Sequence, residues 1–478
     1  MIGIILNDNA YQQDIRELLM AFYPGEGFVY EEQPGLLFCV RGSLSPERTR
    51  FYLDIDPGYA SDPIPVEYED RFTTKNQIKR KLYGYLTAMT GKELPWGTLT
   101  GIRPTKIAMT KLEEGKTAAE IFSHMKDTYY TGNDKIRLSI DIAQREMELI
   151  KAIDCRGGYS LYIGIPFCPT TCLYCSFTSY PISRWEGRTG LYLEALFNEM
   201  EYVAGKKKGC SPDTIYLGGG TPTSLSAADL ELLLTKLKET FDCSGTLEFT
   251  VEAGRPDSIT REKLQVLKKY GVTRISINPQ TMKQETLDLI GRHHTVEMVG
   301  ECFFLARELG FDNINMDLII GLPEETPADV NATLEAVKAL SPDSLTIHSL
   351  AIKRAARLNT MKEVYKDLAI NNTQEMNDLT ARYAKDMGME PYYLYRQKNM
   401  AGNFENVGYA LPGKACIYNI LIMEEKQTIM ACGAGTTTKV VYPDENRLER
   451  VENVKDVEQY ISRIEEMKQR KERLVSKS

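Results

Sequence analysis

The sequence lacks any apolar run long enough to cross a lipid bilayer, so a membrane-spanning protein is not expected. Basic residues are fewer than acidic ones, 58 against 66, so the 478 residues carry a net charge of -8. This charge disfavours a protein that coats the nucleic-acid backbone. The opening MIGIILNDNAYQQDI turns polar too soon for a secretory signal, and we therefore expect a cytoplasmic protein. Internal repeats and low-complexity tracts are absent. With 42% apolar and 26% charged residues, the chain predicts two or three ordinary globular domains.

The sequence pattern divides the chain into four parts. Residues 1–56 alternate short apolar runs with turns and predict a small α+β unit, whereas residues 57–155 predict a helical extension. Residues 156–390 hold six short β-branched runs, each followed by room for a helix: YSLYIGI, TIYLGGG, LEFTVEA, TRISINP, NINMDLIIG and SLTIHSL. This alternation predicts an α/β fold with a parallel sheet, as a complete or partial barrel. Residues 391–478 are expected to close the barrel and to contain a strand near Thr428.

Three of the ten cysteines have a spacing that indicates a metal centre. Cys168, Cys172 and Cys175 lie in IPFCPTTCLYCSF, directly after the first predicted barrel strand. The other seven are scattered singly and are expected to be reduced packing residues. A structural zinc site needs four ligands, and no second Cys or His pair with suitable spacing occurs. Three thiolates on one loop suit a [4Fe-4S] cluster with one open iron, and three unrelated core cysteines are the alternative.

Further candidate ligands lie at the ends of the other predicted strands. The run LGGGTPT closes the second strand, and its glycines would let a ligand approach the backbone amides, although an ordinary strand-to-helix turn is equally compatible. Polar or small residues end the remaining four strands: Glu252, Gln280, Asp317, and His348 with Ala351. Because the carboxyl ends of barrel strands meet at one rim, we interpret these residues as a ligand ring rather than as isolated core groups.

The cysteine triplet, followed one strand later by the glycine-rich turn, resembles the signature of the radical S-adenosylmethionine (SAM) superfamily. The resemblance implies that the open iron binds SAM and that a 5′-deoxyadenosyl radical abstracts hydrogen from the substrate. The phrases TPTSL, VEAGRPD, GRHHT and MDLIIGLPEET further resemble the oxygen-independent coproporphyrinogen III oxidase (dehydrogenase) family, in the branch with a long N-terminal extension. The implied fold is a radical SAM partial (β/α)6 barrel with an N-terminal α+β and helical extension and a small C-terminal domain.

The family's site residues carry over position by position. The cluster would be held by Cys168, Cys172 and Cys175. The cluster-bound SAM would contact Tyr162, Gly219 and Glu252, with Tyr162 and Glu252 as the catalytic residues. A second SAM would be held by Tyr174, Gly220, Thr221, Gln280, Arg292, Asp317 and Ala351. Two departures from the family pattern are Gly164, where the family has His, and Phe177, where it has a fourth Cys.

The resemblance implies a reaction on a tetrapyrrole: two propionates of coproporphyrinogen III become vinyl groups, giving protoporphyrinogen IX and two CO2. The remaining substrate carboxylates need cations. Candidates are Lys353, Arg354, Arg396 and Lys398, each of which could equally be a solvated surface charge. We expect a monomer that binds no nucleic acid, takes electrons from a flavodoxin- or ferredoxin-type donor and uses a further electron acceptor.

Two alternative functions remain open at this point. The related haem chaperone carries a His-Asn-x-x-Tyr-Trp motif, and the comparable run here begins with Glu405 and ends with Ala410, which removes the expected axial ligand. The second alternative is a haem-degrading radical SAM methyltransferase. Near the C-terminus, Gly433 could border a ligand or form a plain tight turn, and Cys416 and Cys432 could hold a second cofactor or simply pack.

Overall fold

The structure is a computed structural model. It describes the chain except for residues 57, 68, 102, 178, 352–355, 362–364, 366–367, 398–402, 446 and 476–478. Three of the predicted substrate-binding cations, Lys353, Arg354 and Lys398, lie outside the described residues. No helix among the described residues is long and apolar enough to span a membrane.

The chain forms two compact units. The first comprises Met1–Gln144 and Tyr395–Glu405, and the second comprises Arg145–Leu394 and Asn406–Ser478. The four-part division inferred from the sequence stays a prediction.

The first unit contains a six-stranded sheet in the order β2-β1-β3-β4-β5, with β6 beside β4. Its strands are β1 (Ile2–Leu6), β2 (Phe28–Val29), β3 (Cys39–Leu44), β4 (Arg50–Asp56), β5 (Tyr59–Ala60) and β6 (Ile64–Pro65). Its helices are α1 (Gln12–Phe22), α2 (Arg71–Thr90), α3 (Thr105–Glu113), α4 (Ala118–Tyr129) and α5 (Asn133–Ile150), the last of which continues into the second unit. Helix α1 buries Ile15, Leu18, Leu19 and Phe22 in one core with Leu82 of α2, as the spacing of an amphipathic helix requires. The expected N-terminal α+β and helical extension is therefore confirmed.

The second unit contains an eleven-stranded sheet in the order β15-β16-β14-β13-β12-β11-β10-β7-β17-β18-β19. Six neighbouring strands are parallel and coincide with the six β-branched runs: β7 (Tyr159–Ile165), β10 (Thr214–Gly219), β11 (Glu248–Gly254), β12 (Arg274–Ile277), β13 (Ile314–Ile320) and β14 (Ser344–Ser349). Their nearly continuous burial explains why they read as apolar runs without alternation. The predicted partial (β/α)6 barrel is confirmed.

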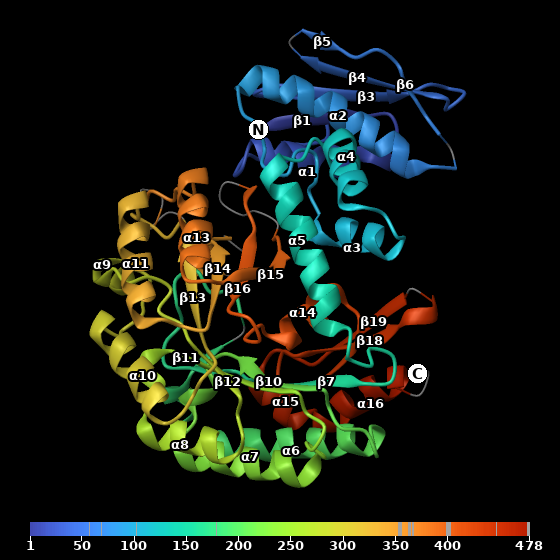
Figure 1. The fold of residues 1–478 in the computed structure, drawn as a ribbon. Helices are drawn as coiled ribbons and strands as arrows, with labels where there is room; N and C mark the ends of the chain where they lie inside the picture. The colour runs from blue at the N-terminus through green and yellow to red at the C-terminus, as the bar shows by residue number, and fades with distance from the viewer. Residues whose placement is uncertain are drawn as a thin grey trace. The chain divides into compact units, whose positions relative to one another are not determined.

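Helices follow the parallel strands and cover the outer face of their sheet (Figure 1). They are α6 (Thr189–Lys206), α7 (Ala227–Thr240), α8 (Arg261–Lys269), α9 (Gln284–Leu289), α10 (Val296–Glu308), α11 (Pro327–Leu340) and α13 (Gln374–Asp386). The short helix α12 (Arg357–Thr360) instead contacts the loop after β7, where the Leu358 amide donates to the Leu173 carbonyl. A Ser or Thr side chain caps the first turn of α7, α8, α10 and α11, namely Ser226, Thr260, Thr295 and Thr326. These caps begin each helix at a defined residue after its strand, which leaves the carboxyl ends of the strands to line the site.

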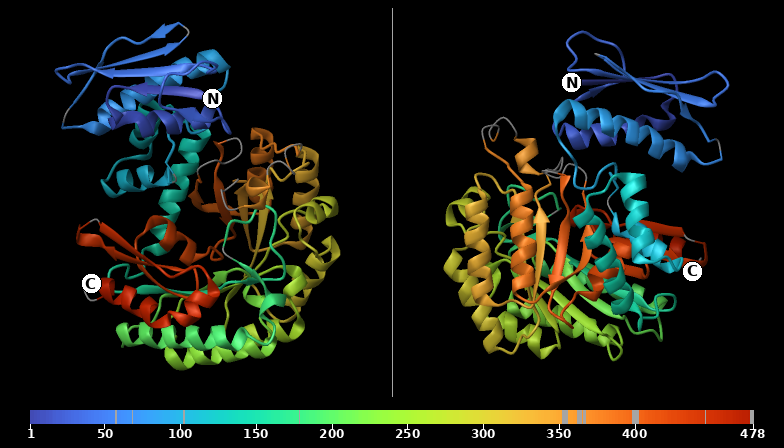
Figure 2. Two further views of the ribbon diagram at one scale, coloured as in Figure 1. Left: turned by 180° about the vertical axis from the view of Figure 1, so that it is seen from behind. Right: turned by 45° about the horizontal axis from the view of Figure 1, so that its top comes forward.

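The C-terminal segment extends the barrel sheet at both edges. It contains β15 (Glu390–Tyr395), β16 (Asn406–Ala410), α14 (Ile417–Glu424), β17 (Thr428–Cys432), β18 (Thr437–Tyr442), β19 (Arg447–Glu452), α15 (Val457–Ser462) and α16 (Ile464–Val475). Strand β16 pairs antiparallel with β14, and β17, which confirms the strand expected near Thr428, pairs parallel with β7. Helices α15 and α16 lie beside α6, which Figure 2 shows from behind.

Candidate functional site

The three predicted cluster cysteines lie in the loop that follows β7. Strand β8 (Phe167–Cys168) pairs with β9 (Tyr180–Pro181), which closes the loop at its base. Within it the Cys175 amide donates to the Cys172 carbonyl at 3.2 Å, and all three cysteines are thiols rather than disulfides. Among the described residues no three His, Cys, Asp or Glu side chains are grouped to hold one metal ion. Cysteine thiolates are the usual ligands of iron-sulfur clusters, so the residue types on this loop fit a cluster.

Two buried arginines flank the sulfur of Cys172. Arg255 places Nη1 at 3.8 Å from Sγ and also donates to the Thr170 hydroxyl at 2.7 Å. Arg292 places its own Nη1 at 3.8 Å from the same sulfur and donates to the Tyr174 hydroxyl at 3.2 Å. Two guanidinium groups at this sulfur offer positive charge and N–H donors to a metal-bound thiolate. Two of the residues that the family resemblance singled out, Tyr174 and Arg292, are thus brought into contact at the cysteine loop.

The glycine-rich turn lies directly against the start of this loop. The Thr221 amide donates to the Phe167 carbonyl at 2.7 Å, and the Thr221 hydroxyl lies 3.6 Å from the Cys168 sulfur. A Cβ atom on Gly220 would stand 2.5 Å from the Phe167 carbonyl oxygen, and Gly219 has a φ of +108°. Glycine is required at both positions, because one has no room for a side chain and the other has a backbone conformation that other residues rarely adopt.

Glu252, at the end of β11, is held by two donors. The Tyr216 hydroxyl donates to its Oε1 at 2.6 Å, and the Gly219 amide is a second donor. Burial raises the pKa of Glu252 to about 7, against the lowering effect of the Tyr216 hydrogen bond. Tyr162 stacks on Tyr216 with ring centroids 6.0 Å apart, and burial, followed by the nearby charge of Glu252, raises the pKa of Tyr162. The three residues expected at the cluster-bound SAM, Tyr162, Gly219 and Glu252, therefore form one connected group.

Sequence reasoning missed Tyr216 and Tyr418. Tyr216 could have been found by aligning the first two predicted strands, because it stands directly opposite Tyr162 in the register of β10 and β7. Tyr418 had no such signal, because it comes from α14, which lies far along the chain, and its ring stacks on Tyr216 at 4.5 Å.

Unsatisfied acceptors lie where the second SAM was expected. Gln280 takes a left-handed conformation with φ +71°, and its amide donates to the Asp317 carbonyl at 3.0 Å. The side-chain oxygens of Gln280 and Asn278 are both buried without a hydrogen-bond partner. Burial would raise the pKa of Asp317, but His348, Asn315 and Thr346 together outweigh it and the pKa is lowered. Buried acceptors without donors fit a ligand that brings amino or hydroxyl groups, as the adenosine of SAM does.

The remaining residues that the sequence singled out differ in their burial and in their contacts. Ala351 follows β14 and is half-buried. Arg396 belongs to the first unit, where it is buried and donates to the Leu99 carbonyl at 2.7 Å, so its part in substrate binding stays a prediction. A Cβ atom on Gly164 would stand 2.4 Å from the Thr436 methyl carbon, so Thr436 occupies the space that the family's His would need. Phe177 is exposed.

The cysteines considered for a second cofactor have other environments. The Cys416 thiol donates to Glu248 at 3.2 Å, and Cys432 is fully buried in β17. Gly433 has a φ of +112°, and its amide donates to Glu199 at 2.7 Å, which indicates a structural turn. These environments favour packing over a second cofactor as the role of both cysteines.

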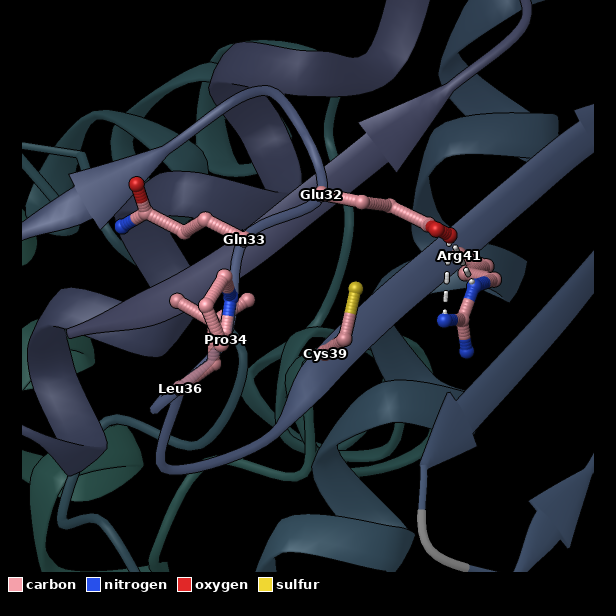
Figure 3. Close-up of a pocket in the computed structure, with 6 residues that line it drawn as sticks. All are labelled: Glu32, Gln33, Pro34, Leu36, Cys39 and Arg41. Atoms are coloured by element: carbon pink, nitrogen blue, oxygen red, sulfur yellow. Dashed lines mark hydrogen bonds and ion pairs between the residues drawn. The ribbon is translucent and has the colours of Figure 1, made fainter.

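A separate hollow of about 330 Å³ lies in the first unit (Figure 3). It is lined by Glu32, Gln33, Pro34, Leu36, Cys39 and Arg41. Arg41 is already paired with Glu32 and with Asp56, and burial raises the pKa of the Cys39 thiol. The hollow therefore offers neither an available cation nor a reactive thiolate.

Comparison with known proteins identifies the family. A model of the radical SAM superfamily matches residues 162–337. The oxygen-independent coproporphyrinogen-III oxidase-like protein HemZ of Bacillus subtilis is 43% identical over 431 residues, which cover 89% of this chain and 84% of HemZ. The chain belongs to the coproporphyrinogen-III oxidase-like group of the radical SAM superfamily. This superfamily uses a [4Fe-4S] cluster and SAM, which are therefore the cofactors of this protein.

Other relatives differ in their named roles. The haem chaperone HemW of Bacillus subtilis is 39% identical over 195 residues, which cover 41% of this chain and 51% of HemW. The solved structure of coproporphyrinogen III oxidase (HemN) from Escherichia coli, a radical SAM enzyme, is 24% identical and covers 67% of this chain and 72% of that chain, with a TM-score of 0.55. This likeness shows the fold. Since the relatives include an oxidase and a chaperone, family membership alone does not fix the activity of this radical SAM protein.

Proposed function

We propose that this radical SAM protein catalyses the oxidative decarboxylation of coproporphyrinogen III to protoporphyrinogen IX. In this proposal Cys168, Cys172 and Cys175 ligate the cluster. Tyr162, Gly219 and Glu252 contact the SAM bound to it. A second SAM is held by Tyr174, Gly220, Thr221, Gln280, Arg292, Asp317 and Ala351. The proposal is supported by the closeness of these residues at the carboxyl ends of the strands, where such barrels carry their chemistry.

The observation that favours an enzyme over a haem chaperone is the environment of Glu405. Glu405 stands where the chaperone motif has its axial His, and its side chain is 4% exposed. Within the first unit its carboxylate accepts from the Trp96 indole at 2.8 Å and pairs with the Lys135 ammonium. A carboxylate buried in this way is already occupied by its two partners, and it lacks the imidazole nitrogen with which the motif would bind haem iron.

The proposed chemistry balances for each propionate. The side chain loses one hydrogen atom from its β carbon, one electron and CO2, and a vinyl group remains. The bound cluster and SAM supply the radical that takes the hydrogen atom. The protein residues hold the reactants in place and keep water out of a site whose walls include the stacked rings of Tyr162, Tyr216 and Tyr418. A flavodoxin- or ferredoxin-type donor and a separate electron acceptor complete the proposal, and a cytoplasmic location stays a prediction.

Product analysis tests the proposal. Protein with a reconstituted cluster is incubated anaerobically with coproporphyrinogen III, SAM, a reductant and an electron acceptor. The expected product is lighter by two formic-acid equivalents, and a monovinyl species should precede it. Haem bound without a change in mass, with coproporphyrinogen untouched, would favour the chaperone function. A methylated linear tetrapyrrole formed from haem would favour the methyltransferase function.

A further inference from the structure

Two tyrosines beside Glu252 were given no role in SAM binding in the function proposed above. Tyr216 lies on β10, and its hydroxyl donates to Glu252 Oε1 at 2.6 Å. Tyr418 lies on α14 and stacks on Tyr216 with a centroid distance of 4.5 Å and an interplanar angle of 25°. Tyr162 lies near both rings, at 6.0 Å from each, so three nearly parallel rings form one group. All three rings are buried near the Glu252 carboxylate, whereas only Tyr162 was expected to contact SAM.

The start of α14 is fastened to the same strand that carries Glu252. Glu248, the first residue of β11, accepts from the Ile417 amide at 2.7 Å and from the Tyr418 amide at 3.3 Å. The Cys416 thiol donates to the same carboxylate. A carboxylate that binds the first amides of a helix caps it and favours its dipole. The position of the Tyr418 ring is therefore fixed relative to β11, and Tyr418 in turn restricts the ring of Tyr216.

The glycine-rich turn leaves space for the contact between Tyr216 and Glu252. A Cβ atom on Gly218 would stand 2.9 Å from Glu252 Oε2 and 2.9 Å from a ring carbon of Tyr216. A side chain at this position would separate the phenol from the carboxylate. The family resemblance covers the whole glycine-rich turn but gives no individual role to Gly218, and this contact explains why the position is glycine.

We propose that Tyr216, restrained by Tyr418, is a positioning residue that holds the Glu252 carboxylate in place for SAM. The inference rests on the proposed contact between Glu252 and the cluster-bound SAM. The Tyr216 hydroxyl and the Gly219 amide both donate to the carboxylate and fix its rotation, and a carboxylate has further lone pairs with which it can accept from a ligand. An ordered carboxylate binds a cationic or hydroxyl group without first losing rotational freedom.

The charged and titratable groups around Glu252 come from five elements. They are Tyr162 on β7, Tyr216 on β10, Arg274 on β12, Asp317 on β13 and Tyr418 on α14. Of these, Asp317 raises the pKa of Glu252, whereas Arg274 and the Tyr216 hydrogen bond lower it. Removal of the Tyr216 hydroxyl therefore raises the pKa of Glu252, so a larger fraction of Glu252 is protonated near neutral pH.

Equilibrium binding of SAM to protein with a reconstituted cluster tests the inference. Wild type, Y216F, Y418L and Y418F are compared by equilibrium dialysis from about pH 6 to about pH 9, with iron and sulfide content measured on each sample. Y216F should bind SAM about tenfold more weakly near neutral pH, and its binding curve should move to higher pH. Y418L should change in the same direction, whereas Y418F keeps the ring and should match wild type. Y159F is the matched control, because the Tyr159 hydroxyl is buried without a partner at the other end of β7.

The outcomes separate the inference from the function on which it rests. A Y216F protein with a full cluster and the wild-type SAM affinity and pH profile would overturn the inference. Loss of the cluster in Y216F would also overturn it, since Tyr216 would then support the fold rather than Glu252. Failure of wild-type protein with a full cluster to bind SAM would instead overturn the proposed function.

Discussion

The ammonium of Lys471 and the carboxylate of Glu199 form an ion pair in which the two side chains are 1% and 0% exposed. The pair joins α16 to α6, and Glu199 also accepts from the Tyr460 hydroxyl and from the Gly433 amide. Asn453 donates to the same carboxylate at 2.8 Å. The last helix of the chain is thereby fastened to the first helix of the barrel, next to the loop that follows β17.

Replacement of Lys471 by Met should destabilise the protein by about 3 to 5 kcal/mol, because Glu199 would remain buried without its cation. Urea unfolding followed by circular dichroism measures this. The control is Lys151 to Met, since Lys151 pairs with Glu148 at the surface, where both side chains are more than half exposed, and should cost less than about 1 kcal/mol. Equal losses in the two variants would contradict the prediction.

Alanine at Cys168, Cys172 and Cys175 together should abolish the cluster, because the substitutions remove the three thiols of the loop that we propose as its ligands. Iron and sulfide analysis with EPR on anaerobically reconstituted protein is the measurement. Cys210 to Ser is the matched control, since this exposed cysteine lies outside the loop and its loss should leave the cluster content unchanged. A full cluster in the triple variant would show that the metal is held elsewhere.

Arg255 should raise the reduction potential of the cluster, because its guanidinium lies 3.8 Å from the Cys172 sulfur in a buried position. Charge and hydrogen bonds at the sulfurs set the potential of an iron-sulfur cluster. Arg255 to Met should therefore give a lower midpoint potential in an EPR redox titration. Arg261 to Met, which removes an exposed arginine paired with Glu308, is expected to leave the potential unchanged. An unshifted potential in the Arg255 variant with full cluster content would refute this.

Glu146 should make the protein less stable as the pH rises. It is fully buried on α5, neither carboxylate oxygen has a hydrogen-bond partner, and burial, followed by the nearby Glu424, raises its pKa well above 4.5. A group whose pKa is higher in the folded state stabilises the fold least at high pH, so stability is lost as the pH rises from about 4.5 through the folded-state pKa. Glu146 to Leu should therefore stabilise the protein by about 1 to 3 kcal/mol at pH 8 and by less at pH 5.

Thermal unfolding at the two pH values measures the effect of the Glu146 substitution. Glu148 to Leu is the control, because Glu148 is largely exposed on the same helix. A gain at pH 5 as large as the gain at pH 8 would mean that ionisation of Glu146 is not the cause.

Much of the barrel could be predicted from local sequence. The six parallel strands match the six β-branched runs, because strands buried on both faces must be apolar along their whole length. The cysteine spacing placed three thiols on one loop, and the run of glycines marked a turn with little room for side chains. These features depend on neighbouring residues, so a sequence pattern carries them.

The parts that escaped prediction depend on residues that are distant along the chain. Tyr418 reaches Tyr216 because α14 is capped by Glu248, and Lys471 meets Glu199 across more than half of the sequence. Glu405 reads as a substituted haem ligand in the sequence, whereas in the fold it accepts hydrogen bonds from Trp96 and Lys135. Local periodicity specifies which side chains are buried, but it does not specify their partners. Burial of a polar group costs free energy unless the group forms a hydrogen bond or an ion pair. In the folded chain the partner can come from any distance along the sequence, so a local pattern does not identify it.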